Sequence, residues 1–140
     1  MEAALVQYLI DACWIINILN GRTTAATDLQ DLWPSPIYLC WTTVAEVYEG
    51  AFHTNDPAAH IASLRAFLAP YPVVPFNDAI AESIAEIRAG LRKSGQSISD
   101  FDVILGATAP HYDLTILTFN VAHLGRIPGI QIFRQTPSSQ

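Results

Sequence analysis

In the stretch Leu5-Val-Gln-Tyr-Leu-Ile-Asp11-Ala-Cys-Trp-Ile-Ile-Asn-Ile-Leu-Asn20, an apolar run ends at an acidic residue and a second apolar run follows. Residues 5–10 are predicted to form a buried strand. Asp11 is a favourable residue at the start of a helix, which we expect over residues 12–20 because Asn20-Gly21 is a good C-terminal stop. This stretch therefore predicts a strand–helix unit with a carboxylate at the junction.

The rest of the chain continues this alternation. Further strands are predicted over residues 37–40, 114–118 and 130–133, with a short extended piece at 73–74. Further helices are predicted over residues 24–32, 42–52, 57–69, 77–94, 99–112 and 121–124. Such alternation predicts an α/β domain over residues 1–134, with a mainly parallel central sheet and helices on both faces, followed by a flexible tail over 135–140.

The composition limits the class of protein. The chain has 140 residues, of which 51% are hydrophobic and only 14% charged, so it can bury a core and is unlike a disordered chain. The high apolar content favours a homodimer or a bound partner that covers part of the surface. The net charge of −6 argues against non-specific binding of nucleic acid, but it is compatible with an enzyme whose acids hold a cation.

The sequence shows no sign of a membrane or secretory protein. Its longest apolar stretch, residues 8–19, is interrupted by Asp11 and Asn17 and is too short to span a bilayer. No basic segment precedes an apolar core as in a signal peptide. Cys13 and Cys40 lie among apolar residues without zinc-binding spacing, so we expect buried, reduced thiols and a cytoplasmic location.

Four acids lie at a strand end or in the first turn of a predicted helix, namely Asp11, Glu46, Asp100 and Asp102. In a parallel sheet these positions open toward the same edge, where ligands bind. Converging carboxylates repel each other by on the order of 4 kcal/mol per pair at 4 Å, for an effective dielectric constant of about 20. Because a hard cation offsets this repulsion, the pattern predicts a Mg²⁺ or Mn²⁺ site that is partly protonated without metal.

Each acid also has a purely structural interpretation. Asp11 can be a helix N-cap. Thr43-Val-Ala-Glu46 fits a capping box, and Ser99-Asp-Phe-Asp102 fits the same pattern with a shorter acid. Two acids in one first turn exceed what capping needs, so the four together favour a metal site over capping alone.

The chain resembles the PIN-domain ribonucleases, in particular the VapC-like toxins of toxin–antitoxin pairs. The matching segments, in the family's order, are Tyr8–Asp11 with the apolar run after it, Thr42-Thr-Val-Ala-Glu46 with Gly50-Ala51, Ile98–Ala109, and Leu114–Asn120 running into Arg126–Ile130.

The resemblance implies roles for these residues. Asp11, Glu46 and Asp102 would be metal ligands, and Asp100 would be an accessory acid that ligates the metal or accepts a proton. Thr118 and Asn120 would orient the acids or the waters of the ion. The implied reaction is metal-dependent hydrolysis of RNA to a 5′-phosphate and a 3′-hydroxyl, with a cognate antitoxin as protein partner.

One departure from the family pattern concerns His123, which stands where many members carry a further acid. This substitution puts a second metal position in doubt, and we favour a surface or RNA-contacting role for His123 over metal binding. Arg22 and Arg126 are weaker candidates for contact with the RNA backbone. A catalytically silent binding module and a housekeeping RNA-processing nuclease are the alternatives.

Two other classes that build acid clusters on parallel sheets fit the sequence poorly. A phospho-acceptor signalling domain needs a lysine near a late strand, whereas Lys93 is the only lysine and lies in a predicted helix. A haloacid-dehalogenase-type phosphatase needs Asp-x-Asp directly after the first strand, whereas Asp11 is followed by Ala12-Cys13.

Overall fold

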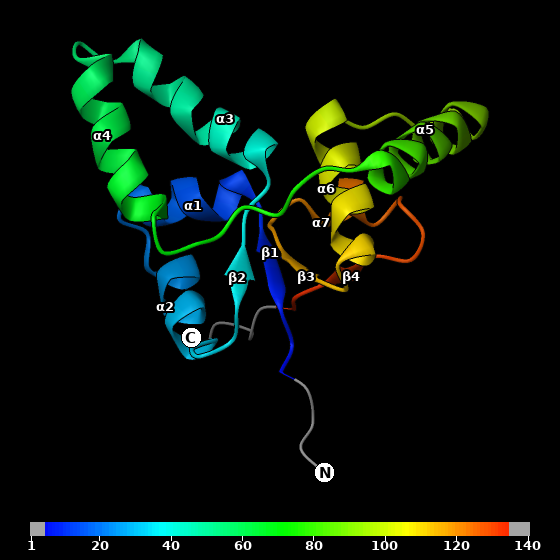
Figure 1. The fold of residues 1–140 in the computed structure, drawn as a ribbon, viewed down its shortest axis with the longest axis horizontal. Coiled ribbons are helices and arrows are strands. Elements are labelled where there is room, and N and C mark those ends of the chain that lie inside the picture. The colour runs from blue at the N-terminus through cyan, green and yellow to red at the C-terminus, as the bar shows by residue number, and fades with distance from the viewer. Residues whose placement is uncertain (1–4, 135–140) are drawn as a thin grey trace.

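The structure, a computed structural model, describes residues 5–134, so the predicted tail over 135–140 lies outside the described residues. A four-stranded sheet has the order β2-β1-β3-β4, and every neighbouring pair is parallel (Figure 1). The strands are β1 (Tyr8–Ile10), β2 (Ile37–Tyr38), β3 (Thr115–Leu117) and β4 (Gln131–Ile132). The predicted parallel α/β fold is therefore confirmed.

The helices form within a few residues of the predicted bounds. They are α1 (Ala12–Leu19), α2 (Thr23–Asp31), α3 (Trp41–Glu49) with a 3₁₀ turn η1 (Gly50–His53), α4 (Pro57–Leu68), α5 (Asp78–Lys93), α6 (Asp100–His111) and α7 (Val121–Leu124). The extended piece at 73–74 forms a parallel bridge between Val73 and Leu39. Every helix in residues 5–134 is too short or too polar to cross a lipid bilayer.

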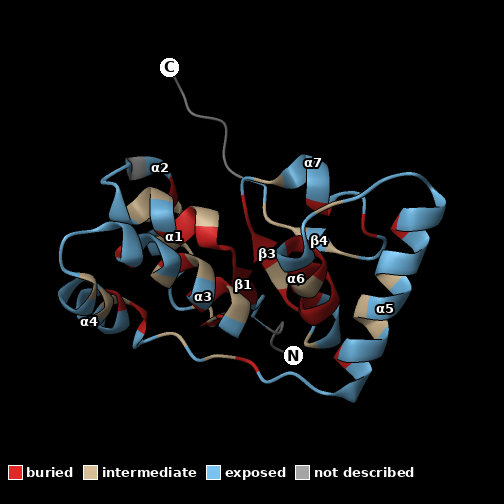
Figure 2. Ribbon diagram, turned by 90° about the horizontal axis from the view of Figure 1, so that it is seen from above, coloured by how far each residue is buried: buried red, intermediate tan, exposed pale blue. Residues whose placement is uncertain are grey.

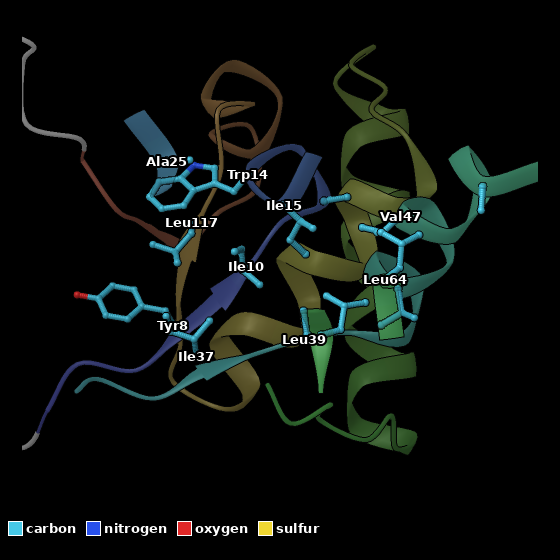
Figure 3. Packing of buried hydrophobic residues seen from close by; sticks show 14 residues of the cluster. Tyr8, Ile10, Trp14, Ile15, Ala25, Ile37, Leu39, Val47, Leu64 and Leu117 are labelled. Atoms are coloured by element: carbon cyan, nitrogen blue, oxygen red, sulfur yellow. The ribbon is translucent and has the colours of Figure 1, made fainter. Parts of the chain in front are cut away.

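Helices cover both faces of the sheet. The first four helices lie on one side of it, and α5, α6 and α7 lie on the other (Figures 1 and 2). Strand β1 contributes side chains to the hydrophobic cores on both faces, because Tyr8 and Ile10 point to one face and Leu9 to the other. On the first face, Ile10 packs in a cluster with Trp14, Ile15 and Leu117 (Figure 3).

On the second face, Leu9 and Ile116 pack in a cluster with Leu105 and Ala109 of α6. This cluster holds α6 against the sheet, and the N-terminus of α6 carries two of the candidate acids. The two cores therefore fix the elements that meet at the carboxyl edge of the sheet.

The N-termini of the helices show whether the candidate acids and the hydroxyl residues beside them act as helix caps. Asp11 is the N-cap residue of α1 but its side chain makes no capping hydrogen bond. The capping-box interpretation of Thr43 and Glu46 is wrong, because α3 begins at Trp41 with Cys40 as N-cap, which leaves Thr43 inside the first turn. Of the three caps considered for the candidate acids, that of Ser99 forms, and Ser99 accepts a hydrogen bond from the backbone N–H of Asp102 at 3.1 Å.

Candidate active site

The site begins where the two central strands end. Asp11 directly follows β1, and its backbone N–H donates to the carbonyl of Leu117, the last residue of β3, at 2.9 Å. Thr118 follows β3, and its hydroxyl donates to Oδ2 of Asp11 at 2.6 Å. Asp11 and Thr118 are only 7% and 3% exposed. The pairing of β1 with β3 therefore places a carboxylate and a hydroxyl from distant parts of the chain in direct contact.

Asp102 joins the same network from α6. The side-chain amide of Asn120 donates to Oδ2 of Asp102 at 2.9 Å, and the backbone N–H of Asn120 donates to Oγ1 of Thr118, also at 2.9 Å. A continuous hydrogen-bonded path thus runs from Asp11 through Thr118 and Asn120 to Asp102. Nδ1 of His123, half-exposed on α7, lies 3.9 Å from Oδ2 of Asp102 at the rim of the site.

Glu46, on the second turn of α3, is the third acid of the cluster. Burial raises its pKa to about 7, and the negative charges of Asp11, Asp102 and Glu49 add to this effect. Burial and the charge of Asp11 also raise the pKa of Asp102, while hydrogen bonds from Ser99 and Asn120 and the charge of His123 act against that rise. The charge of Asp11 therefore opposes the ionisation of both Glu46 and Asp102, and the charge of Asp102 opposes that of Glu46.

Cys13 belongs to the site, although its sequence context suggested only a buried thiol. Its Sγ lies 3.4 Å from Oδ2 of Asp11 and accepts the backbone N–H of Phe119 at 3.3 Å. Burial and the adjacent charge of Asp11 raise the pKa of the thiol to about 11, so it stays protonated at neutral pH. The sequence feature that could have placed Cys13 in the site is its position two residues after Asp11, in the first turn of α1.

Three other predicted residues are not brought into the cluster. Oδ1 of Asp100 pairs with Nη1 of Arg88 on α5 at 3.1 Å, and the Asp100 side chain is 72% exposed. Arg126 donates from Nη1 to the carbonyl of Ser97 at 3.2 Å. Arg22 is the exposed N-cap residue of α2.

Comparison with known proteins identifies the family. The model of the PIN domain matches residues 8–128, most of the chain. The chain belongs to the PIN-domain family. The fold and family expected from the sequence motifs are thus confirmed.

Relatives of this PIN domain include named nucleases. The tRNA(fMet)-specific endonuclease VapC of Salmonella typhimurium is 23% identical over 128 residues, which cover 91% of this chain and 97% of that protein. Ribonuclease VapC2 of Haemophilus influenzae is 24% identical over 123 residues, covering 88% of this chain and 93% of that protein.

Solved structures show the same fold. The VapBC2 structure from Rickettsia felis, bound to a DNA fragment from its promoter, superposes with a TM-score of 0.82 at 19% identity over 91% of this chain and 98% of that chain. FitAcB from Neisseria gonorrhoeae superposes with a TM-score of 0.78 at 23% identity, over 91% of this chain and 97% of that chain.

The donor set of this PIN domain suits a hard divalent cation. Within residues 5–134, no three His, Cys, Asp or Glu side chains stand close enough to form a preformed metal cage. Yet the charge of Asp11 opposes the ionisation of Glu46 and Asp102, and carboxylate oxygens are the ligands that Mg²⁺ and Mn²⁺ prefer. Since a cation would relieve that opposition, the residues fit a metal whose binding draws the three acids together.

Proposed function

We propose that this PIN domain is a divalent-metal-dependent endoribonuclease and the toxin of a toxin–antitoxin pair. The observation that carries the proposal is the set of Asp11, Glu46 and Asp102 at the carboxyl edge of the sheet, two of them tied together through Thr118 and Asn120. The names of the VapC relatives, an endonuclease and a ribonuclease, support the same reaction class.

In the proposed mechanism, Asp11, Glu46 and Asp102 would hold Mg²⁺ or Mn²⁺. A bound divalent ion supplies an acidified water and positive charge that offsets the charge developing on the phosphate. Thr118 donates a hydrogen bond to one oxygen of Asp11, and Asn120 donates one to an oxygen of Asp102. These hydrogen bonds orient the carboxylates of Asp11 and Asp102 before the ion arrives.

Asp100 and His123 take different places in this proposal. Because Arg88 engages Asp100 on the solvent side of α6, we leave Asp100 out of the ligand set. His123 stands half-exposed beside Asp102, where its ring can meet an RNA phosphate at the mouth of the site. We assign no role at the phosphate to Arg126, whose guanidinium is bonded to Ser97.

The partners follow from the same site. We infer an RNA substrate in the cytoplasm and a cognate antitoxin, consistent with VapBC relatives described as toxin–antitoxin systems. A basic side chain of such an antitoxin would be attracted to the three acids. Trp41 and Phe52, on and just after α3, are 60% and 65% exposed, which supports coverage of this region by the antitoxin or a second copy of the chain. Light scattering of the isolated protein would measure the proposed homodimer.

The test is RNA cleavage by the purified chain with Mg²⁺, Mn²⁺ or EDTA. Asp11→Asn, Glu46→Gln and Asp102→Asn should each abolish cleavage, whereas Asp100→Asn is the matched control and should cleave normally. Products should carry 5′-phosphates and 3′-hydroxyls. Cleavage that is indifferent to EDTA and to all three substitutions would refute the proposal, and no cleavage under any condition would favour a silent binding module.

The toxin role needs its own measurement. Expression of the chain should arrest growth, and co-expression of the partner should relieve the arrest. An active nuclease that causes no arrest would instead indicate a housekeeping RNA-processing enzyme.

A further inference from the structure

A cavity of about 700 Å³ lies beside the segment that carries Thr118 and Asn120. We call it the β3–β4 cavity. It is lined by Thr118, Phe119 and Val121 and by β4 with the residues beside it, including Ile130, Phe133 and Arg134. Its volume lies within the range of about 300–1,000 Å³ found for small-molecule sites.

The segment from Thr118 to Val121 separates the cavity from the carboxylates. Thr118 and Asn120 hydrogen-bond toward Asp11 and Asp102, whereas Phe119 and Val121 line the cavity. Phe119 is 40% exposed and Val121 is 51% exposed. A group seated in the cavity would therefore lie directly beside the candidate active site.

The ring of Phe119 is held as a flat platform. It stacks on Trp14 with ring centroids 5.7 Å apart and an interplanar angle of 28°, and Trp14 is fully buried. Phe133 packs edge-on against the same indole at 5.8 Å. Both aromatic side chains of the cavity are thus supported by one rigid residue, which leaves part of the Phe119 ring exposed for another flat group.

The charge of the cavity selects an anionic occupant. Arg134 is the only charged side chain among its described lining residues, although the whole chain carries a net charge of −6. A basic peptide segment would gain nothing there, whereas a phosphate would be attracted. An exposed aromatic ring and a guanidinium that line the same cavity are the combination that binds a nucleobase and its phosphate.

We propose that the β3–β4 cavity binds the base of a nucleotide next to the scissile phosphate, stacked on Phe119 with Arg134 near a flanking phosphate. This inference rests on the proposed ribonuclease function and specifies its substrate. A base inside the cavity cannot be paired, so the substrate is RNA that is single-stranded at the cleavage position.

The experiment measures equilibrium binding of the four nucleoside 5′-monophosphates and of ribose 5-phosphate to the full chain, with Mg²⁺ and with EDTA. At least one nucleotide should bind about five-fold or more tightly than ribose 5-phosphate, because stacking adds to the phosphate contact. Phe119→Leu should remove that preference, and Phe76→Leu, at another exposed phenylalanine, should keep it.

A second variant provides a test of the cavity in case Phe119→Leu does not fold. Val121→Glu introduces a carboxylate into the cavity from an exposed position, so it should weaken nucleotide binding while the chain stays folded. Val6→Glu is its control, because Val6 is 52% exposed and does not line the cavity.

The outcomes separate this inference from the proposed function. Equal affinity for nucleotides and ribose 5-phosphate, or cleavage of a duplex as fast as of the same strand alone, overturns the base site while leaving the nuclease intact. Nucleotide preference that depends on Phe119 in a chain without nuclease activity supports the base site and defeats the proposed reaction. If Phe119→Leu and Val121→Glu spare nucleotide binding but abolish association with the antitoxin, the cavity is a peptide site and the inference fails.

Discussion

Replacement of Thr118 by valine tests whether its hydroxyl organises the acids. Valine has nearly the same shape, so the packing of this residue, 3% exposed, is kept while three hydrogen bonds are lost, with Asp11, the N–H of Asn120 and the thiol of Cys13. A hydrogen bond to a charged group contributes about 1.5–3 kcal/mol, and the N–H of Asn120 loses its acceptor as well. We expect the free energy of unfolding to fall by about 2–3 kcal/mol, which lowers Tm by about 7–10 °C for a chain of this length.

Two other buried threonines serve as matched controls. Thr108 is fully buried, and its hydroxyl donates to the carbonyl of Ile104 in its own helix at 2.7 Å and also hydrogen-bonds the thiol of Cys40, so Thr108→Val should cost about 0.5–1.5 kcal/mol. The buried hydroxyl of Thr43 has no partner among the described residues, so Thr43→Val should be neutral or stabilising. The three variants make the same chemical change and differ only in what the hydroxyl contacts.

The assays are thermal unfolding, and RNA cleavage across a titration of Mg²⁺ or Mn²⁺. Thr118→Val should weaken the apparent affinity for the metal in the cleavage assay by about 10–100-fold, as is typical for residues that orient metal ligands. Thr108→Val should leave that affinity unchanged. If Thr118→Val and Thr108→Val lose equal stability and both retain the full metal response, the path from Asp11 to Asp102 does not organise the site.

The remaining predictions concern pH, the peripheral acid and packing. Because the pKa of Glu46 is raised to about 7 in the folded chain above its ordinary value of 4.5, the metal-free protein should lose stability as pH rises from about 4.5 to 7 and level off above. Glu46→Gln should flatten that slope in denaturant titrations, and an unchanged slope would contradict the assignment. Asp100→Asn should leave RNA cleavage within about two-fold of wild type, since an exposed pair such as Arg88–Asp100 contributes at most about 1 kcal/mol to stability. Gly106→Ala should destabilise the chain because the new Cβ would overlap Cδ1 of the buried Ile127, and adding Ile127→Val should recover part of the loss in the same unfolding assay.

Local sequence pattern was sufficient to locate the strands and helices, but it could not predict the order of the strands in the sheet. Turn residues and periodicity located α5, whose N-cap Asn77 accepts the N–H of Ile80 at 2.9 Å. The order β2-β1-β3-β4 depends on pairing between segments as distant as Tyr8 and Thr115, which no local pattern records. The carboxyl-edge rule for parallel sheets still brought Asp11 and Thr118 to the same edge, because it holds for any such order.

The choice between Asp100 and Asp102 depends on helix rotation. Two residues along a helix differ by about 200°, so neighbouring acids at this spacing face nearly opposite directions. Asp102 shares the buried face of α6 with Leu105 and Ala109, at helical spacing, whereas Asp100 faces solvent and Arg88. The positions of Leu105 and Ala109 therefore indicate that Asp102 lies on the buried face, which the first turn of the helix alone does not indicate.

Thr43 and Cys13 show where sequence rules reach their limit. A capping box needs the hydroxyl residue at the N-cap, and α3 starts three residues earlier than that pattern requires, because the chain is still extended at Cys40 and turns helical at Trp41. Cys13 looks like a core thiol by its neighbours, but the helix start after Asp11 turns its sulfur toward Phe119 and Asp11. The outcome for Thr43 depends on the residue at which a helix begins, which sequence patterns locate only to within a few residues. The outcome for Cys13 depends on a contact with Phe119, which is distant in sequence.

The path from Asp11 to Asp102 also has a structural consequence beyond the acids. Asp11 follows Ile10, which packs in the first core, and Asp102 lies in the first turn of the helix that carries Leu105, which packs in the second. Thr118 and Asn120 therefore link the two helical layers at the edge of the sheet where β1 and β3 end. Because the same hydrogen bonds hold the layers and orient the acids, a change that frees the carboxylates should also loosen the junction between the cores. In this fold, stability and metal response are consequently expected to vary together at Thr118 and independently at Thr108.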